Sequence, residues 1–171
     1  MATRKITPCL WFDGEAEEAA NFYVSLLPNS RIDRVQRNVT DTPAGKTGTV
    51  LAVAFTLAGQ RFLALNGGTR FEYTPAISFQ VDCADQAEVD RLWDALSDGG
   101  AAQRCGWLKD RFGVSWQIVP TVLPKLLGDR DLAKAQRVMQ AMLGMSKLDI
   151  AGLEAAHAGR PRDVTTTGEP Q

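Results

Sequence analysis

The chain has 171 residues, of which 44% are hydrophobic and 23% charged, as in ordinary globular domains. Its 19 basic and 20 acidic residues nearly cancel and form no basic block, which argues against nucleic-acid binding. No apolar run approaches the roughly 20 residues that cross a bilayer, and the N-terminus lacks the apolar stretch of a signal peptide. We therefore expect a cytoplasmic protein without a nucleic-acid or membrane partner.

The N-terminal part of the sequence predicts one helix among four strands. A strand over residues 5–12 ends at the turn pair Asp13-Gly14. Apolar residues at helical spacing, with glutamates in the first turn, then predict a helix over residues 15–27. The strands expected after this helix cover residues 31–39, 49–57 and 61–66.

The same order begins again near residue 76, and this repeat is the most informative feature of the sequence. A strand is predicted over residues 76–82, a helix over 86–96, and short strands from there to Pro120. The repeat indicates two related modules, about residues 4–66 and 76–120. The two helices superimpose with a shift of seventy positions, which matches Glu18 with Glu88, Ala19 with Val89, Phe22 with Leu92, Tyr23 with Trp93, and Leu26 with Leu96.

After the second module the composition becomes helical. A short segment over residues 121–127 precedes a helix over 131–145, and a further short helix lies within residues 146–158. We assign residues 1–145 to a single domain and predict that residues 159–171 form a flexible tail. The apolar side of these helices must pack against the sheet or against a second subunit.

The stretch GWLKDRFGVSWQIVP, residues 106–120, predicts two short strands around a tight turn. Asp110 lies at that turn. Its carboxylate either binds backbone N–H groups there, which we favour, or acts as a general base in a desolvated site. Trp107 either covers a binding site or packs into the core, whereas Trp11 and Trp116 are expected in the core.

The cysteines and the single histidine give no sign of a reactive centre. Cys9, Cys83 and Cys105 form neither a CxxC pair nor an even set, which predicts reduced thiols. We expect each of them to be a small buried hydrophobic residue, and a chemical role for Cys105 stays open. His157 falls in the last predicted helix, where a surface or interface position is more typical than metal ligation.

Three segments resemble a known family: FDGEAEEAANFYVSLLPNSRI, SFQVDCADQAEVDRLWDALSDGG and, above all, CGWLKDRFGVSWQIVP. They are similar to the PhnB-like, or 3-demethylubiquinone-9 3-methyltransferase-like, branch of the vicinal oxygen chelate superfamily. This superfamily includes glyoxalases, dioxygenases and antibiotic-resistance proteins. The resemblance covers roughly residues 4–159. It implies an α+β, glyoxalase-like fold of paired βαβββ modules with C-terminal helices, a cleft formed by curled strands, and a homodimer.

The resemblance also implies a divalent metal held by four His, Glu or Gln side chains on the first and last strands of each module. The matching positions here are Pro8, Ala64, Ala76 and Gln117. Even a shift of one residue brings no imidazole or carboxylate to any of them, and one amide beside a cysteine is not a metal site. We therefore expect no metal and no other cofactor.

The methyltransferase name of this branch has no support in the sequence. Enzymes that use S-adenosylmethionine on a doubly wound sheet carry a Gly-rich turn after the first strand, whereas this strand ends in Asp13-Gly14-Glu15. No GxSxG elbow is present, and Ser115 has no histidine near it in the sequence. We therefore assign no catalytic residue.

Strand alternation predicts which side chains line the cleft, with Cys9, Trp11, Phe79 and Trp116 turned toward the helices. The lining is mostly apolar with a few amides and hydroxyls, which suits a small organic molecule bound by shape and hydrogen bonds. The predicted lining residues are Leu10, Asn66, Ser78, Gln80, Trp107, Ser115 and Gln117.

Our leading functional hypothesis is a small-molecule binding protein of this fold that lacks the superfamily's metal. Three alternatives remain open. The first is a metal-dependent lyase, isomerase or dioxygenase. The second is a methyltransferase, as the family name says, and the third is a structural dimer with a filled cleft. Bound metal, binding of S-adenosylmethionine, or the absence of any stabilising ligand would distinguish these alternatives.

Overall fold

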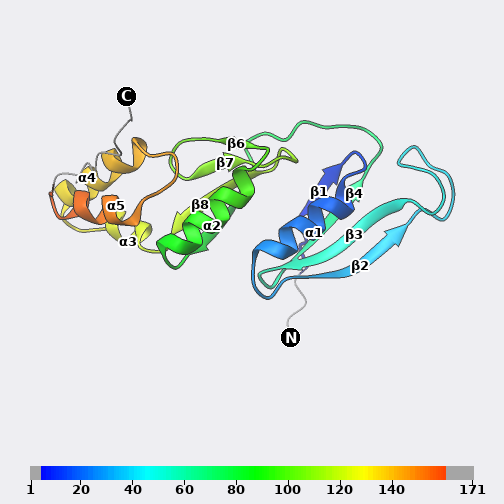
Figure 1. Ribbon diagram of the computed structural model, residues 1–171, viewed down its shortest axis with the longest axis horizontal. Coiled ribbons are helices and arrows are strands. Elements are labelled where there is room, and N and C mark those ends of the chain that lie inside the picture. The colour runs from blue at the N-terminus through cyan, green and yellow to red at the C-terminus, as the bar shows by residue number, and fades with distance from the viewer. Residues whose placement is uncertain (1–4, 161–171) are drawn as a thin grey trace, which may run out of the picture. The chain divides into compact units, whose positions relative to one another are not determined.

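A computed structural model describes residues 5–160, and in it the chain forms two compact units that divide between Tyr73 and Thr74. Each unit contains one four-stranded sheet. The strand orders are β1-β4-β3-β2 in the first unit and β5-β8-β7-β6 in the second, so the fourth strand of each module pairs with the first (Figure 1).

The first module follows the order strand, helix and three strands. Its sheet is antiparallel except for β1, which runs parallel to β4. This parallel pair places the two ends of the module side by side, in register from Cys9 and Leu63 to Phe12 and Asn66. The elements are β1 (Cys9–Phe12), α1 (Ala16–Leu26), β2 (Arg31–Arg37), β3 (Val50–Leu57) and β4 (Gln60–Asn66).

The second module repeats this order and confirms the internal repeat. Its first strand again runs parallel to its last, and the other pairs are antiparallel. Both β5 and α2 begin seventy residues after their counterparts β1 and α1. The elements are β5 (Phe79–Cys83), α2 (Gln86–Ser97), β6 (Ala101–Ala102), β7 (Trp107–Lys109) and β8 (Ser115–Pro120).

The α+β fold of paired βαβββ modules is therefore confirmed, and the strand boundaries differ from the prediction at prolines. The strand expected from residue 76 begins at Phe79, because Pro75 has no N–H to donate to a neighbouring strand and residues 75–77 form a turn instead. In the first strand, Pro8 still accepts a hydrogen bond from the Leu63 N–H through its carbonyl oxygen, at 2.9 Å.

The start of α1 is held by a side chain from the far end of the module. Glu15 precedes the helix but makes no capping bond. Instead the Oδ1 atom of buried Asn66 accepts hydrogen bonds from the N–H groups of Gly14 and Ala16, each at 3.0 Å, and its Nδ2 donates to the Val50 carbonyl at 3.0 Å. Because the first N–H groups of a helix have no partner within it, Asn66 supplies what the helix lacks.

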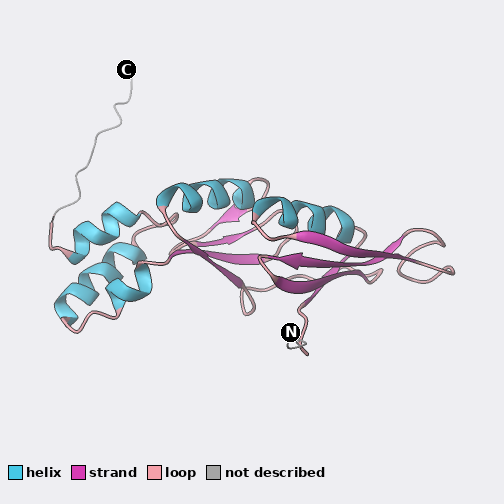
Figure 2. Cartoon of the chain, turned by 90° about the horizontal axis from the view of Figure 1, so that it is seen from below, coloured by secondary structure: helices cyan, strands magenta, loops and turns pink. Residues whose placement is uncertain are grey.

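The helices α1 and α2 each lie on one face of the sheet of their own module (Figure 2). In the first module Tyr23 of α1 stacks on Phe55 of β3, with 6.4 Å between ring centroids, and Phe55 stacks on Phe62 of β4 at 5.3 Å. In the second module the buried stripe of α2 contains the residues that the sequence predicts, namely Val89, Leu92, Trp93 and Leu96.

The C-terminal helices pack against the second module, which was one of the two possibilities raised by the sequence. Val119 of β8 joins an apolar cluster with Val138, Leu148 and Leu153. The amide of Gln86, the first residue of α2, donates to the Leu148 carbonyl at 3.1 Å and accepts from the Ile150 N–H at 2.8 Å. The helices are α3 (Leu123–Leu127), α4 (Leu132–Leu143) and α5 (Ile150–His157).

Two further findings concern the ends of the chain and its helices. Of the predicted tail over residues 159–171, all but Gly159 and Arg160 lie outside the described residues. Between residues 5 and 160, no helix has the length and apolar composition needed to span a bilayer.

The role of Asn66 gives a first prediction. Asn66→Ala should destabilise the protein by roughly 2–3 kcal/mol, because the N–H groups of Gly14 and Ala16 lose a buried acceptor. Urea unfolding measures this loss. Asn21→Ala is the matched control, since Asn21 is exposed on α1 and should shift the midpoint little. Equal midpoints for the two variants would contradict the structural role of Asn66.

Candidate functional site

One face of the second sheet carries most of the polar side chains that the sequence singles out. Gln117 of β8 pairs with Gln80 of β5 on one side and with Trp107 of β7 on the other. Directly paired residues share a face of a sheet, so these three side chains project the same way. Their sequence neighbours Leu108 and Trp116 pair on the other face and are buried there.

Two serines complete this arrangement. The Nε2 atom of Gln117 donates to Ser78 Oγ at 2.9 Å, and Ser115 is buried two residues before Gln117 on the same face. Strand pairing and alternation therefore bring five of the predicted lining residues to one face, namely Ser78, Gln80, Trp107, Ser115 and Gln117. Their contact with a ligand stays a prediction.

The sequence missed Lys109, which belongs to the same face. Lys109 pairs with Ser115 and lies two residues after Trp107 on β7. In the sequence it stands in the run Lys109-Asp110-Arg111, whose charges are also typical of a turn. The alternation of Trp107, Leu108 and Lys109 is the signal that could have placed it in the strand. We call Ser78, Gln80, Trp107, Lys109 and Gln117 the polar face.

In the first module the predicted orientation of the strands is wrong. Asn66 reaches the start of α1, and Phe12, its partner in the sheet, is on the same side. Leu10 and its partner Ala64 have the same parity and are also buried. Leu10 and Asn66 thus lie on the helix-covered face, because the amide of Asn66 serves a helix end. Neither residue therefore belongs to the face that carries Gln80 and Gln117.

The opposite face of the first module carries Cys9 and Trp11. Trp11 is half-buried rather than part of the core, and its indole Nε1 donates to the Thr69 carbonyl at 2.7 Å. The ring meets Phe71 edge-on at 5.3 Å. Gly67 lies directly beneath the indole, where a Cβ atom would overlap the ring, so this position requires glycine.

Asp110 holds the turn of the β7–β8 hairpin. Its buried carboxylate accepts from the Phe112 and Val114 N–H groups through Oδ1, both at 2.9 Å, and from the Trp116 indole through Oδ2 at 2.8 Å. Gly113 turns the chain with a φ of 89°. This agrees with the favoured reading of Asp110 as a turn residue, and Trp116 is buried as predicted. Three donors leave the carboxylate poorly suited to act as a general base.

The opposite end of β7 is fixed by the C-terminal helices. Cys105 and Gly106 both adopt positive φ, at 61° and 80°. Their N–H groups donate to the carbonyls of Met145 and Ser146, each at 2.8 Å. Trp107 follows immediately, so the connection between α4 and α5 helps to set where the tryptophan enters the sheet.

The cysteines differ from one another in burial. Cys83 is buried, Cys105 half-buried and Cys9 exposed, so the expectation of three buried cysteines is wrong for Cys9. Burial, with smaller contributions from neighbouring carboxylates, raises the pKa of the Cys83 thiol to about 12. Cys83 is therefore protonated at neutral pH and is a poor nucleophile.

The residues present do not fit the metal site that the resemblance implies. At or next to the matched metal-ligand positions, the strands β1, β4 and β8 present Cys9, Leu63 and Gln117 on the faces that lie away from the helices. The fourth matched residue, Ala76, lies in a turn. A thiol, an alkyl group and an amide are not a ligand set for a divalent cation. Residues 5–160 contain no group of three or more His, Cys, Asp and Glu side chains placed to hold a metal ion.

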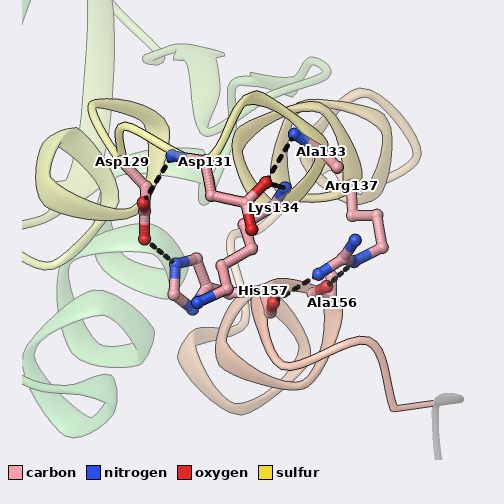
Figure 3. Close-up of polar contacts among 7 residues, drawn as sticks. All are labelled: Asp129, Asp131, Ala133, Lys134, Arg137, Ala156 and His157. Atoms are coloured by element: carbon pink, nitrogen blue, oxygen red, sulfur yellow. Dashed lines mark hydrogen bonds and ion pairs between the residues drawn. The ribbon is translucent and has the colours of Figure 1, made fainter.

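The histidine takes part in a polar cluster among the C-terminal helices (Figure 3). His157 Nε2 lies 2.7 Å from Asp129 Oδ2, and both side chains are half-buried. Asp131 caps α4 by accepting from the Ala133 N–H at 3.0 Å. Arg137 donates to the carbonyls of Ala156 and His157 at the end of α5, at 2.9 and 2.8 Å. These contacts tie helix ends together and leave His157 with a structural role.

Comparison with known proteins identifies relatives of the first two-thirds of the chain. The profile of the family described as 3-demethylubiquinone-9 3-methyltransferase matches residues 4–119. The PhnB protein from Bacillus cereus is 39% identical, with a TM-score of 0.64, over 69% of this chain and 100% of its own. Protein PA1353 from Pseudomonas aeruginosa is similar in fold, at 23% identity and a TM-score of 0.57, over 69% of this chain and 98% of its own. No curated protein sequence matches this chain significantly.

The hairpin contacts predict that Asp110→Asn destabilises the protein by about 1–3 kcal/mol, because an amide offers only one acceptor atom to three donors. Urea unfolding followed by tryptophan fluorescence measures the change. Asp98→Asn, at an exposed position just after α2, is the matched control. If both variants unfold at the wild-type midpoint, the carboxylate does not hold the hairpin.

The cluster around His157 predicts a pH effect. The hydrogen bond from the Asp131 N–H, followed by the contact with His157, lowers the pKa of the Asp129 carboxyl. A lowered folded-state pKa adds stability that is present above the unfolded-state pKa, about 3.9, and is lost as the pH falls through the folded-state pKa. Asp129→Asn should therefore show a shallower loss of stability below about pH 4. Parallel curves of unfolding free energy against pH for variant and wild type would refute this.

Proposed function

Because the chain belongs to the 3-demethylubiquinone-9 3-methyltransferase family, the PhnB-like branch of the vicinal oxygen chelate superfamily, we propose that it binds a small organic molecule on the polar face of its second module. Binding uses hydrogen bonds and contact with an aromatic ring. It does not use the divalent metal that the superfamily's enzymes hold, since no suitable ligand set lies on the strands.

The observation that carries this proposal is the row formed by Gln80, Gln117 and Trp107 across three adjacent strands. Gln117 uses Nε2 to bond Ser78, which fixes the orientation of the amide. Its Oε1 atom has no hydrogen-bond partner among the described residues and is available to a ligand donor. A half-buried aromatic ring beside fixed amides is typical of sites that select small organic molecules.

A methyltransferase activity has no comparable support. Enzymes that bind S-adenosylmethionine on a doubly wound sheet do so at the carboxyl ends of several parallel strands. Here each sheet contains a single parallel pair, and the first strand is followed by Asp13 and Gly14 rather than by a Gly-rich phosphate or cofactor turn. A homodimer, implied by the resemblance, stays a prediction that sedimentation would check.

A screen of small organic compounds by thermal unfolding should identify molecules that raise the midpoint, because a ligand that binds the folded state stabilises it by mass action. Gln117→Ala should then weaken the affinity for such a molecule about fivefold to tenfold, the effect of losing roughly one hydrogen bond. The fold should be retained, since Gln117 is only half-buried.

Gln140→Ala is the matched control, because Gln140 is exposed on α4 and makes the same chemical change outside the polar face. A ligand whose affinity is equal in Gln117→Ala, Gln140→Ala and the wild-type protein binds elsewhere. That result, or a screen in which no compound stabilises the protein, would contradict the proposed function.

A further inference from the structure

The ammonium group of half-buried Lys109, on the polar face, forms no ion pair and no hydrogen bond with any described residue. Other lysines behave differently: Lys46 pairs with Asp41 at 3.1 Å, and Lys147 pairs with Asp90 at 2.9 Å. A positive charge that is partly removed from water without a counter-ion attracts an anion from solution.

Two carboxylates, one adjacent to Lys109 in the sequence and one on its face of the sheet, are engaged elsewhere. Asp110 follows it directly, but alternation turns its carboxylate to the α2 side, where it accepts from Phe112, Val114 and Trp116. Asp82 shares the face of Lys109, yet it lies two strands away and four residues along, about 16 Å on a regular sheet. Its Oδ1 atom accepts from Gln80 Nε2 at 2.8 Å.

The neighbours of Lys109 on its own face suit the rest of a ligand. Trp107 lies two residues before it on β7, which on a strand corresponds to about 7 Å. Gln117 is paired with Trp107, one strand spacing of about 5 Å away. The ammonium group, the indole and the amide therefore lie within reach of one molecule the size of a substituted aromatic acid.

We propose that the polar face takes a small organic anion with a flat apolar body. Its carboxylate or phosphate pairs with the Lys109 ammonium group, its apolar body lies against the Trp107 ring, and its polar substituents meet the amides of Gln117 and Gln80. This inference rests on the proposed function and narrows it to a ligand class. A cationic ligand would be repelled by Lys109, and a ligand without a flat apolar part would leave Trp107 unused.

The test uses three simple probes with one ring in common: benzoate, phenyl phosphate and the neutral isostere benzamide. Each is titrated into the full-length protein up to about 10 mM, a range that covers the millimolar affinities of small fragments. The chemical shift of the Trp107 indole N–H, assigned by comparison with Trp107→Leu, reports binding at the polar face. Wild-type protein should bind benzoate or phenyl phosphate about tenfold more tightly than benzamide, the effect of a charge-assisted contact.

Lys109→Gln removes the charge and keeps much of the side chain. It should reduce the preference for the anion over benzamide to about twofold or less, while the affinity for benzamide itself changes little. Lys125→Gln, at an exposed position on α3, is the matched control and should keep the wild-type preference. Trp107→Leu should lower the affinity for all three probes by a similar factor. In this variant, binding is measured from the backbone chemical shifts of β8.

The outcomes separate this inference from the proposed function. If benzamide binds as tightly as benzoate and phenyl phosphate, or if Lys109→Gln retains the preference for anions, the anion inference is wrong although binding at the polar face stands. If no probe shifts the signals of Trp107 or β8, both proposals are contradicted. Benzoate and phenyl phosphate need not bind with equal affinity. If both lose their higher affinity relative to benzamide in Lys109→Gln, the inference holds, and the tighter of the two identifies the preferred anionic group.

Discussion

The carboxylate of Asp110 holds the β7–β8 hairpin in a single register, and the polar face depends on that register. Its three hydrogen bonds join the turn at Phe112 and Val114 to the indole of Trp116, which lies on the α2 side of the sheet. Because side chains alternate along a strand, a shift of one residue would turn Trp116 outward and bury Gln117. The Asp110 carboxylate thus decides which side chains project from the polar face.

The C-terminal helices support the same hairpin from its other end. The N–H groups of Cys105 and Gly106 bond the connection between α4 and α5, and Gln86 joins the start of α2 to that of α5. The family profile ends at residue 119, so these helices lie beyond the matched region. They nevertheless fix the residue before Trp107. We infer that the helices belong to the structural basis of the site rather than forming an independent addition.

The helices and the repeat could be predicted from the sequence because their signals are local and periodic. The stripe of α2 and the shift of seventy residues are both observed as expected. Strand orientation was harder, since alternation states which residues share a face but not which face the helix covers. Gln80 and Gln117 share the face that lies away from α2, as alternation indicates, and their contact with a ligand stays a prediction. Leu10 and Asn66 lie on the opposite face from the one expected, because the Asn66 side chain binds the N–H groups at the start of α1. Lys109 was missed because a charged residue beside a turn also suits the turn.

We propose that this chain of paired βαβββ modules presents a binding face that works without a metal. Thermal unfolding of metal-stripped protein with Mn²⁺, Ni²⁺, Zn²⁺ or Fe²⁺, each at about a hundred times a micromolar Kd, tests this proposal. A true site would add about 2.7 kcal/mol, or roughly 5–10 °C for a chain of this length. We predict no such shift with any of the four ions. A shift of that size, abolished by Gln117→Ala, would place a metal centre on the polar face and contradict the metal-free proposal.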